Sequence, residues 1–532
     1  MTSTDATAQP PTDTSDRSPK VFLETFGCQM NVLDSQLVEG QLRALGYRFI
    51  DNWEAADVVI YNTCSVREHA EQKVYSRIGR VMKHKDRARP DLVLGIIGCM
   101  AERDGLDMAK RFPAVNILCG PGELDKLPQL LDNAVRTTQA DRHHASASLA
   151  GQNALQGNTH RRSATLTAAA DDLELLDLSR SFSPDQHHGS AYVRITRGCN
   201  KFCTYCVVPN TRGAEVHRPP DSLVDECRKL VESGVAEITL LGQTVNHYHY
   251  NNAQATRVNN VLQPQIGAAI GPAGPKGGSD VTTFADLLAR IHDEIPQLQR
   301  LRFVTSFPRD FGDDILQVIA DRPRIARYLH LPVQSGSNRV LKAMNRGYEI
   351  AEYEDLLVRA RRIIPDLQIA SDLICGFPGE TEDDHQMTCD LIRRARYKNC
   401  FIFKYSPRPG TAAIDRFEDD VPDEVKKRRN NELLAIQNEI SSMIHAEQVG
   451  RTERVFVESI SHREKKARNA AMVGAGVTVT LGWEQPRERV QLTGRTEGDL
   501  IVMFDGEATM VGEFVDVVIE SAGALVLFGR KC

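Results

Sequence analysis

Short apolar runs that alternate with helical patterns constrain this chain more than any other feature of its sequence. Four such runs lie in the first part of the chain, at residues 21–27, 57–63, 92–98 and 115–120. Continuous apolar strands between helices are typical of a parallel sheet that is covered on both faces. Residues 20–136 are therefore predicted to form a doubly wound α/β domain of modest size.

A second series of strand-and-helix units lies between residues 189 and 421. Its six candidate strands are residues 191–196, 236–242, 300–306, 328–333, 367–374 and 400–406. Six successive units of this kind predict a parallel barrel or partial barrel, with functional residues at the C-terminal ends of the strands. The predicted fold class is thus α/β and multidomain.

The remaining segments differ in composition. Residues 1–19 are predicted to be a disordered leader, residues 137–188 a linker and residues 251–280 a flexible insertion. Residues 422–450 are predicted to be a charged helical connector. Residues 451–532 contain short β-branched runs and Gly-rich turns, which favour a small antiparallel β-barrel. Its expected strands are residues 454–460, 476–482, 489–494, 500–506 and 514–520.

Composition limits where the protein acts and how it binds. The formal net charge of −6 excludes attachment to nucleic acid by bulk positive charge, although a local basic patch remains possible. There is no secretory signal and no apolar run near the ~18 residues of a membrane span. We therefore expect a cytoplasmic protein without a membrane partner. Twelve cysteines are too few for a disulfide scaffold of this length.

Three cysteines fall within one tight segment. Cys199, Cys203 and Cys206 form a C-x3-C-x2-C pattern directly after the first strand of the second series. Zinc would need a fourth ligand, and Cys227 and His217 stand at poor spacing for one. Three thiolates with one open corner instead favour an iron–sulfur cluster. Three unligated thiols in a loop are the alternative, but clustered exposed thiols oxidise readily.

Three further cysteines are far apart in the sequence but share a position. Cys28, Cys64 and Cys99 each follow a strand of the first series. The C-terminal ends of parallel strands meet at one edge of the sheet, so we expect these thiols to converge. Small buried cysteines are common in such strands, yet three repeats of one position favour a second cluster. Cys119 precedes the last residue of its apolar run, so it is not expected to be a ligand of this cluster.

Several motifs resemble the methylthiotransferases, a family of radical S-adenosylmethionine enzymes. They lie around Cys28, Cys64 and Cys99 and at residues 197–213, 240–246, 330–337, 344–348, 372–381 and 405–411. The resemblance implies an N-terminal cluster domain, a radical core and a terminal TRAM barrel. It also implies two 4Fe–4S clusters on the six cysteines and two molecules of S-adenosylmethionine, with no catalytic residue beyond the clusters. Gly242, Gln243, Gly376 and Glu380 are expected to contact S-adenosylmethionine, although these segments could equally serve only as turns at strand ends.

The residues after Cys28 and Cys64 resemble the branch that modifies N(6)-dimethylallyladenosine in tRNA. The expected reaction adds a 2-methylthio group to that base beside the anticodon. The implied partners are a tRNA anticodon stem-loop and a reductase that donates electrons, and we expect a monomer. Two alternatives stay open: the same chemistry on threonylcarbamoyladenosine or a ribosomal-protein aspartate, or a non-catalytic iron–sulfur protein that binds RNA.

Other charged and polar residues are ambiguous. The window from Arg67 to Arg89 holds eight Lys or Arg against three acids, and its proximity to Cys64 favours phosphate contact. Basic runs at residues 426–429 and 463–468 could also contact phosphate, but their positions in the sequence favour this role less. His247 and His249 resemble a metal-binding pair but lack partners at coordinating spacing, so they are expected to lie in an ordinary loop. Arg302 and Asp372 could contact a cofactor or base, or could equally belong to structural ion pairs.

Overall fold

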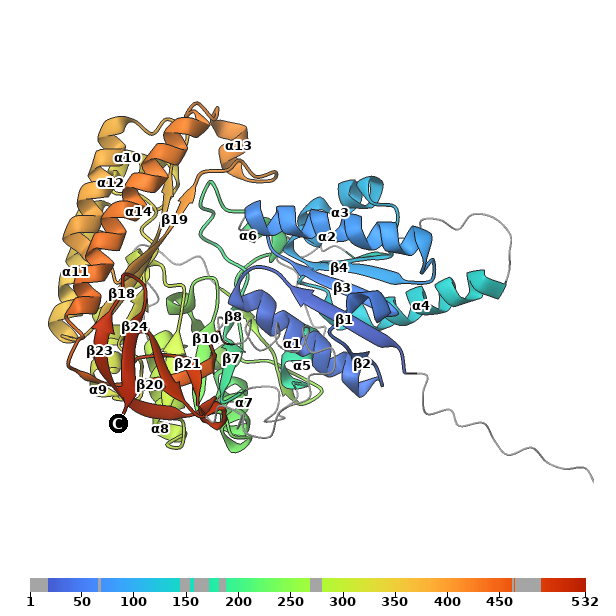
Figure 1. Cartoon of the computed structure of the whole chain (residues 1–532), viewed down its shortest axis with the longest axis horizontal. Helices are drawn as coiled ribbons and strands as arrows, with labels where there is room; N and C mark the ends of the chain where they lie inside the picture. Colours follow the sequence, from blue (N-terminus) through green and yellow to red (C-terminus); the bar gives the residue numbers. More distant parts are fainter. Residues whose placement is uncertain are drawn as a thin grey trace, which may run out of the picture. The chain divides into compact units, whose positions relative to one another are not determined.

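The chain folds into two compact units, residues 1–158 and residues 159–532, and each is described by itself. The computed structural model describes residues 18–65, 68–143, 154–156, 172–180, 188–267, 280–461, 464 and 489–532. Helices and strands carry the labels of Figure 1. Among the described residues, no helix combines the length and the apolar character that a membrane span requires.

The first unit is built on one parallel sheet with the strand order β2-β1-β3-β4-β5-β6. The strands are β1 (Lys20–Thr25), β2 (Arg48–Phe49), β3 (Val58–Thr63), β4 (Val93–Gly98), β5 (Ile117–Cys119) and β6 (Ala154–Gln156). The helices are α1 (Gln29–Ala44), α2 (Glu68–Arg87), α3 (Cys99–Arg111) and α4 (Leu127–His143). The order and the crossovers confirm the predicted doubly wound fold.

Successive side chains of each strand point to opposite faces of the sheet, and helices cover both faces. Val59 and Tyr61 of β3 join a core cluster that also contains Val74 and Ile78 of α2 and Met100 of α3. Figure 1 shows α2 and α3 on one face of the sheet and α1 on the other. Because successive side chains of a strand point to opposite faces, both faces of the buried strands must be apolar.

The second unit contains the six predicted parallel strands, arranged as two three-stranded sheets with the orders β16-β10-β7 and β17-β18-β19. A parallel bridge from Leu301 of β16 to Ile325, in the segment just before β17, connects the two sheets into a partial barrel. The strands are β7 (Ser190–Arg194), β10 (Glu237–Leu241), β16 (Arg300–Phe303), β17 (Tyr328–His330), β18 (Gln368–Cys375) and β19 (Asn399–Lys404).

Helices follow these strands along the chain. They are α6 (Val208–Thr211), α7 (Pro220–Glu232), α8 (Phe284–Glu294), α9 (Asp313–Asp321), α10 (Asn338–Ala343), α11 (Ile350–Ile363), α12 (Glu382–Ala395), α13 (Ala412–Arg416) and α14 (Asp423–Ala446). The predicted connector is α14, and it is more than a connector. Its residues Leu433, Ile436 and Ile440 belong to the main core of the unit.

Five strands at the end of the chain close a small barrel with the order β20-β21-β22-β24-β23. They are β20 (Thr452–Ile460), β21 (Val490–Arg495), β22 (Ile501–Gly506), β23 (Phe514–Ala522) and β24 (Leu527–Lys531). All neighbouring pairs are antiparallel except β22 and β24, which are parallel. The fifth strand is therefore β24, which the sequence reading missed. Residues 476–482, predicted as a strand, lie outside the described residues.

Two predicted irregular segments contain regular structure. The predicted linker includes β6, which pairs with β5, and α5 (Asp172–Leu178). The predicted insertion includes β12 (Arg257–Val258), β13 (Val261–Leu262) and β14 (Gln265–Ile266). Strand β14 pairs with β9 (Val216–His217), and β9 also pairs with β8 (Thr196–Arg197). Residues 1–17 of the predicted leader lie outside the described part of the chain.

Asp499 attaches the terminal barrel to the N-terminal ends of the core strands. Its carboxylate forms ion pairs with Arg302 of β16 and with Lys398, the residue before β19. Arg495 of β21 adds a third contact at 3.2 Å. Burial alone would raise the pKa of Asp499, but the three cations outweigh burial and hold its pKa below the usual range. The barrel therefore docks through a buried charge cluster.

Asp499→Asn should destabilise the second unit because it removes the anion that neutralises buried cations. A loss of about 3–5 kcal/mol is expected in denaturant unfolding at neutral pH. The wild-type contribution is complete above the unfolded-state pKa of about 3.9 and declines as pH falls towards the lowered folded-state pKa. The control is Asp505→Asn, at an exposed position of β22, which should change stability by less than about 0.5 kcal/mol. Equal effects of the two substitutions would contradict this role.

Candidate metal centres

Cys28, Cys64 and Cys99 lie at one edge of the first sheet. They follow β1, β3 and β4, which are immediate neighbours in the strand order. Thr63 pairs with Gly98 across β3 and β4, so Cys64 and Cys99 start side by side. Cys64 and Cys99 are buried and Cys28 is half-buried. The structure thus brings these three predicted positions to neighbouring strand ends.

Two glycines allow the backbone to approach closely at this edge. Gly27 has φ +112°, and a Cβ placed on it would lie 2.7 Å from the Sγ atom of Cys64. Gly98 has φ +90°, and its Cβ would lie 2.5 Å from Oδ1 of Asn62. Both positions exclude a side chain for two reasons, the left-handed conformation and the missing space. The turn that carries Cys28 therefore lies directly against Cys64.

A buried hydrogen-bond network stabilises the loops that carry Cys28 and Cys64 at this edge of the sheet. The side-chain amide of Asn31 donates to the carbonyl oxygens of Phe26 and Thr63, at 3.0 and 2.9 Å. The amide of Asn62 donates to the carbonyl oxygen of Asn31 at 2.8 Å and to the hydroxyl of Ser35 at 2.9 Å. Asn31 and Asn62 therefore cross-link the loops that carry Cys28 and Cys64. Such networks fix one geometry because every buried polar group needs its partner.

The local electrostatics favour thiolates. Cys28 is the N-cap residue of α1 and Cys99 is the first residue of α3, so both lie at the positive ends of helix dipoles. Cys119 differs, because its thiol donates to the carbonyl oxygen of Glu123 at 3.2 Å and burial raises its pKa. Three thiols at helix starts and strand ends fit a metal cluster. Cys119 fits a neutral core thiol.

Cys199, Cys203 and Cys206 lie in the loop after β8. Gly198, with φ +68°, starts the loop, and a Cβ there would lie 2.5 Å from the carbonyl oxygen of Gly213. The N–H of Cys199 donates to that same carbonyl group, and the N–H of Cys206 donates to the carbonyl oxygen of Cys203. Burial raises the pKa of the Cys199 thiol, and the Glu215 carboxylate adds to this effect. A bound cation would reverse the penalty, since it deprotonates a coordinating thiol.

Arg346 supplies a buried positive charge to the same loop. Its guanidinium lies 3.5 Å from Sγ of Cys203 and 3.5 Å from the hydroxyl of Tyr205. It also donates to the carbonyl oxygen of Pro332 and contacts the hydroxyl of Tyr348. The sequence reading missed Arg346, because 143 residues separate it from Cys203. Its position places a buried positive charge beside Cys203.

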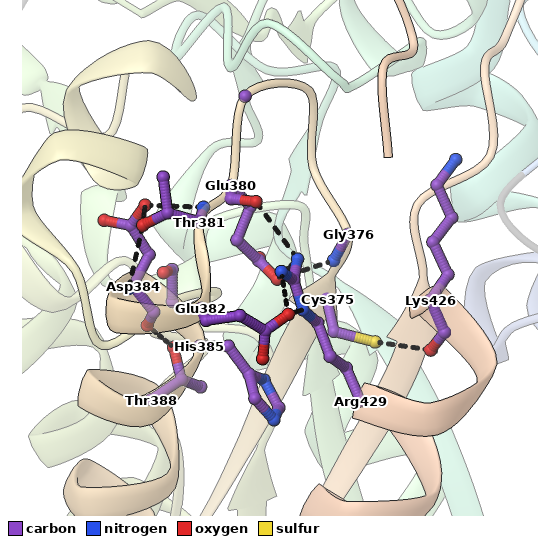
Figure 2. A network of polar contacts seen from close by, with 12 residues as sticks. Cys375, Gly376, Glu380, Thr381, Glu382, Asp384, His385, Thr388, Lys426 and Arg429 are labelled. Carbon is purple, nitrogen blue, oxygen red and sulfur yellow. Dashed lines mark hydrogen bonds and ion pairs between the residues drawn. The ribbon is translucent and has the colours of Figure 1, made fainter. Parts of the chain in front are cut away.

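The loop after β18 carries two of the residues expected to contact S-adenosylmethionine, and Figure 2 shows its polar contacts. Glu380 accepts from the N–H of Gly376 at 3.0 Å and from Arg429 of α14 at 2.8 Å. Burial raises the pKa of Glu380, and Gly376 and Arg429 oppose that shift. A Cβ on Gly376, which has φ +71°, would overlap the side chain of Lys426. Glu380 therefore shapes the loop through contacts within the protein.

The other expected cofactor contacts lie after β10. Gly242 is buried, and a Cβ there would overlap the hydroxyl of Thr196. Gln243 is half-buried. The Thr196 hydroxyl is buried without a hydrogen-bond partner among the described residues. This strand end thus keeps a polar atom available beside the loop of Cys199.

Two ambiguous residues turn out to be ion-pair members. Arg302 is held by Asp499, as described above, and the carboxylate of Asp372 accepts from Nε2 of His330 at 2.9 Å. The prediction that His247 and His249 lie in an ordinary loop is wrong, because His247 ends the short helix η4 (Val245–His247) and His249 begins the strand β11 (His249–Asn251). The ring of His247 is buried and bonded to Glu215 at 2.7 Å, and His217 and His249 lie nearby. The sequence does not predict the grouping of Glu215 with these three histidines, because only the tertiary fold brings them together.

The basic segments differ in how their charges are used. In the run at residues 426–429, Lys426 pairs with Asp419 and Arg429 pairs with Glu380 and Glu382. These two are therefore structural. The run at residues 463–468 lies outside the described residues except for position 464. On α2, Arg77 pairs with Glu24 at 3.3 Å.

Four basic residues of α2 remain on the surface. They are exposed, take part in no ion pair between described side chains, and share one helix face by their spacing of seven, three and four residues. These residues, named the α2 stripe below, are Lys73, Arg80, Lys83 and Arg87. Their helix begins four residues after Cys64.

Comparison with known families defines the class of protein. Residues 20–120 match the model described as uncharacterized protein family UPF0004, and residues 193–392 match the radical SAM superfamily. The chain is accordingly a radical S-adenosylmethionine enzyme that uses 4Fe–4S clusters. A solved radical S-adenosylmethionine methyltransferase, TsrM of Kitasatospora setae, is similar with 16% identity and a TM-score of 0.49 over 74% of each chain.

Curated relatives narrow the class to one family. The tRNA-2-methylthio-N(6)-dimethylallyladenosine synthase of Rhodopirellula baltica is 41% identical and covers 96% of this chain and 95% of its own length. The protein of the same name from Phocaeicola vulgatus is 36% identical over 97% of each chain. The chain belongs to the family of tRNA-2-methylthio-N(6)-dimethylallyladenosine synthases.

Gly27→Ala should selectively disturb the first triad. Its Cβ would collide with Cys64, so the loop of Cys28 must move and iron bound after anaerobic reconstitution should fall by about half. Gly46→Ala is the matched control, because Gly46 has φ +86° but nothing within 4 Å of its Cβ position. Both variants carry the left-handed strain of about 1–2 kcal/mol, and only the first carries the collision. Equal iron contents in the two variants would argue against the close approach.

Proposed function

We propose that this chain is the tRNA methylthiotransferase that replaces the C2 hydrogen of N(6)-dimethylallyladenosine with a methylthio group, beside the anticodon. The observation that carries the proposal is the pair of cysteine triads at strand ends in a chain of this family. The proposal includes cytoplasmic residence, a monomeric state and a reductase as electron donor. S-adenosylmethionine and the clusters, when bound, supply the radical chemistry and the site for the transferred sulfur.

The six cysteines are assigned to two clusters. Cys28, Cys64 and Cys99 hold one, and the loop cysteines at 199, 203 and 206 hold the other. Each set offers three thiols, which leaves one corner of a four-iron cluster for a small-molecule ligand. Within the protein, Asn31 and Asn62 orient the first set and Arg346 stabilises negative charge at the second. Gly242, Gln243, Gly376 and Glu380 form the strand-end loops assigned to S-adenosylmethionine.

Nucleoside mass spectrometry provides the direct test. A strain that lacks this gene should contain dimethylallyladenosine without its methylthio derivative, and the wild-type gene should restore the derivative. Cys64→Ala and Cys203→Ala should each abolish restoration. Cys119→Ala is the control, because this buried thiol of the first sheet is bonded to a backbone carbonyl, and it should restore the product.

Other outcomes would overturn the assignment. A methylthio derivative that persists in the deletion strain excludes this substrate. Loss of a methylthio group from threonylcarbamoyladenosine, or from a ribosomal-protein aspartate, would identify one of the alternative substrates. Restoration by both cysteine variants would indicate a non-catalytic protein.

The α2 stripe is assigned to tRNA phosphates. Its arginines and lysines are exposed and free of ion pairs with described side chains, unlike the basic residues at 426 and 429. A local patch is needed because the whole chain carries a formal net charge of −6. Phosphate contacts of this kind give affinity that falls with salt.

Replacing all four residues of the α2 stripe by glutamine should weaken tRNA binding and flatten its salt dependence. Each lost contact should reduce the slope of log K against log salt by about 0.7–0.9. The control is the double variant Arg393→Gln and Arg394→Gln on α12, where both side chains are paired with acids. Titrations at several salt concentrations provide the measurement. An unchanged slope in the stripe variant would remove α2 from the interface.

A further inference from the structure

A buried cluster of one carboxylate and two imidazoles lies outside both cysteine triads. Glu215 precedes β9, His217 belongs to β9, and His247 ends the short helix η4 (Val245–His247) after β10. One ligand atom from each of the three residues lies within 4.8 Å of the others. The side chains of Glu215 and His217 are completely buried, and that of His247 is almost so. Three potential metal ligands therefore face one another in the interior.

Hydrogen bonds within the protein do not satisfy this cluster. Both ring nitrogens of His217 and Nε2 of His247 are buried without a hydrogen-bond partner among the described residues. A neutral imidazole carries one N–H donor and one acceptor, so His217 leaves two groups unpaired. Each unpaired buried group costs about 1–3 kcal/mol. This cost is difficult to explain unless the site has a ligand.

The charge of Glu215 also lacks compensation. Its carboxylate contacts Nδ1 of His247 at 2.7 Å and the hydroxyl of Thr244 at 3.3 Å, and no Lys or Arg pairs with it among the described residues. A buried carboxylate needs compensating positive charge, and a bound cation would supply it.

The surrounding backbone leaves room for close approach. A Cβ on Gly267 would lie 2.6 Å from Nε2 of His217, and the N–H of Gly267 donates to the carbonyl oxygen of Glu215 at 2.8 Å. The ring of His249 lies beside that of His217, with centroids 4.6 Å apart. Three segments therefore converge here: the β8–β9 connection, the segment after β10, and the strand β14.

We propose that Glu215, His217 and His247 bind one zinc ion, with water in the fourth position, separate from both iron–sulfur clusters. Two neutral imidazoles and one carboxylate are ligands that zinc takes in proteins. Ferrous iron also binds histidine and carboxylate ligands. A site with nitrogen and oxygen ligands generally binds zinc more tightly than ferrous iron. No thiol belongs to the group, which separates it from the triads.

The ion would position the cysteine loop through Asn200. The side chain of Asn200 accepts from the N–H of Glu215 at 3.0 Å and donates to the carbonyl oxygen of Gly267 at 3.3 Å. Asn200 directly follows Cys199. A zinc ion on Glu215 would thus fix the residue whose N–H donates to Asn200 and whose carbonyl oxygen accepts from Gly267.

Metal analysis of the full chain, reconstituted with iron and sulfide and then dialysed, tests the proposal. About one zinc per chain is expected in addition to cluster iron. Zinc-edge X-ray absorption should show only nitrogen and oxygen neighbours at about 2.0–2.1 Å. This measurement uses the wild type, so it does not depend on the folding of any variant. A shell of sulfur at about 2.3 Å would place the zinc on cysteines and overturn the proposal.

Single variants then locate the ion. His217→Gln and His247→Gln should each reduce bound zinc at least tenfold. The matched control is His385→Gln, because His385, Cys389 and Glu432 form another candidate group. There, Nε2 of His385 is already bonded to Glu432 at 3.0 Å, so this variant should keep its zinc. Wild-type protein without zinc, iron in its place, or loss of zinc in the His385 variant would each overturn the assignment.

Discussion

Parallel pairing of β1, β3 and β4 is the constraint on which the first centre depends. Because the strands run in the same direction, their ends meet at one edge, and a residue just beyond each end reaches the same region. Thr63 and Gly98 are paired, so the cysteines that follow them begin in register. Gly27 then allows the loop after β1 to lie against Cys64. A side chain at Gly27 would separate thiols that the sheet has brought together.

Buried ion pairs hold the parts of the second unit together, whereas close backbone approach at glycines shapes the cysteine site of the first unit. Asp499 joins the terminal barrel to Arg302 and Lys398. On another side, Arg218 is completely buried and pairs with Glu174 of α5 and with Glu226 at 2.8 Å each. These pairs attach α5 and the barrel to the strands. Buried pairs of this kind specify one arrangement, because any displaced partner leaves an uncompensated charge.

The sequence predicts this fold to the extent that its elements repeat. Periodic apolar runs identified the six core strands, and strand-end position grouped Cys28, Cys64 and Cys99. Strand β24 was missed because its five residues carry two adjacent basic side chains and little apolar pattern. Strand β6 has only three residues and depends on pairing with β5. Short edge strands form because an adjacent strand supplies hydrogen-bond partners. The local sequence pattern does not reveal that such a strand will be adjacent.

Clusters of side chains from distant segments are even harder to predict from the sequence than short strands. Arg346 reaches Cys203, and His247 reaches Glu215, only through the packing of segments that are distant in sequence. Spacing could identify the C-x3-C-x2-C loop, because its chemistry lies within eight residues. It could not assign the charges around that loop. The sequence does not distinguish His247 from a loop histidine, but its Nε2 atom is buried without a hydrogen-bond partner among the described residues.

These charges have opposite signs on the two sides of the cysteine loop. Arg346 places a cation beside Cys203, whereas Glu215 places an anion near Cys199. Assembly of a cluster requires negative thiolates at both positions, so an uncompensated Glu215 would oppose it at Cys199. A divalent ion on Glu215 would cancel that repulsion and leave Asn200 in place. The geometry therefore links the inferred zinc site to the iron–sulfur site through electrostatics as well as through the backbone.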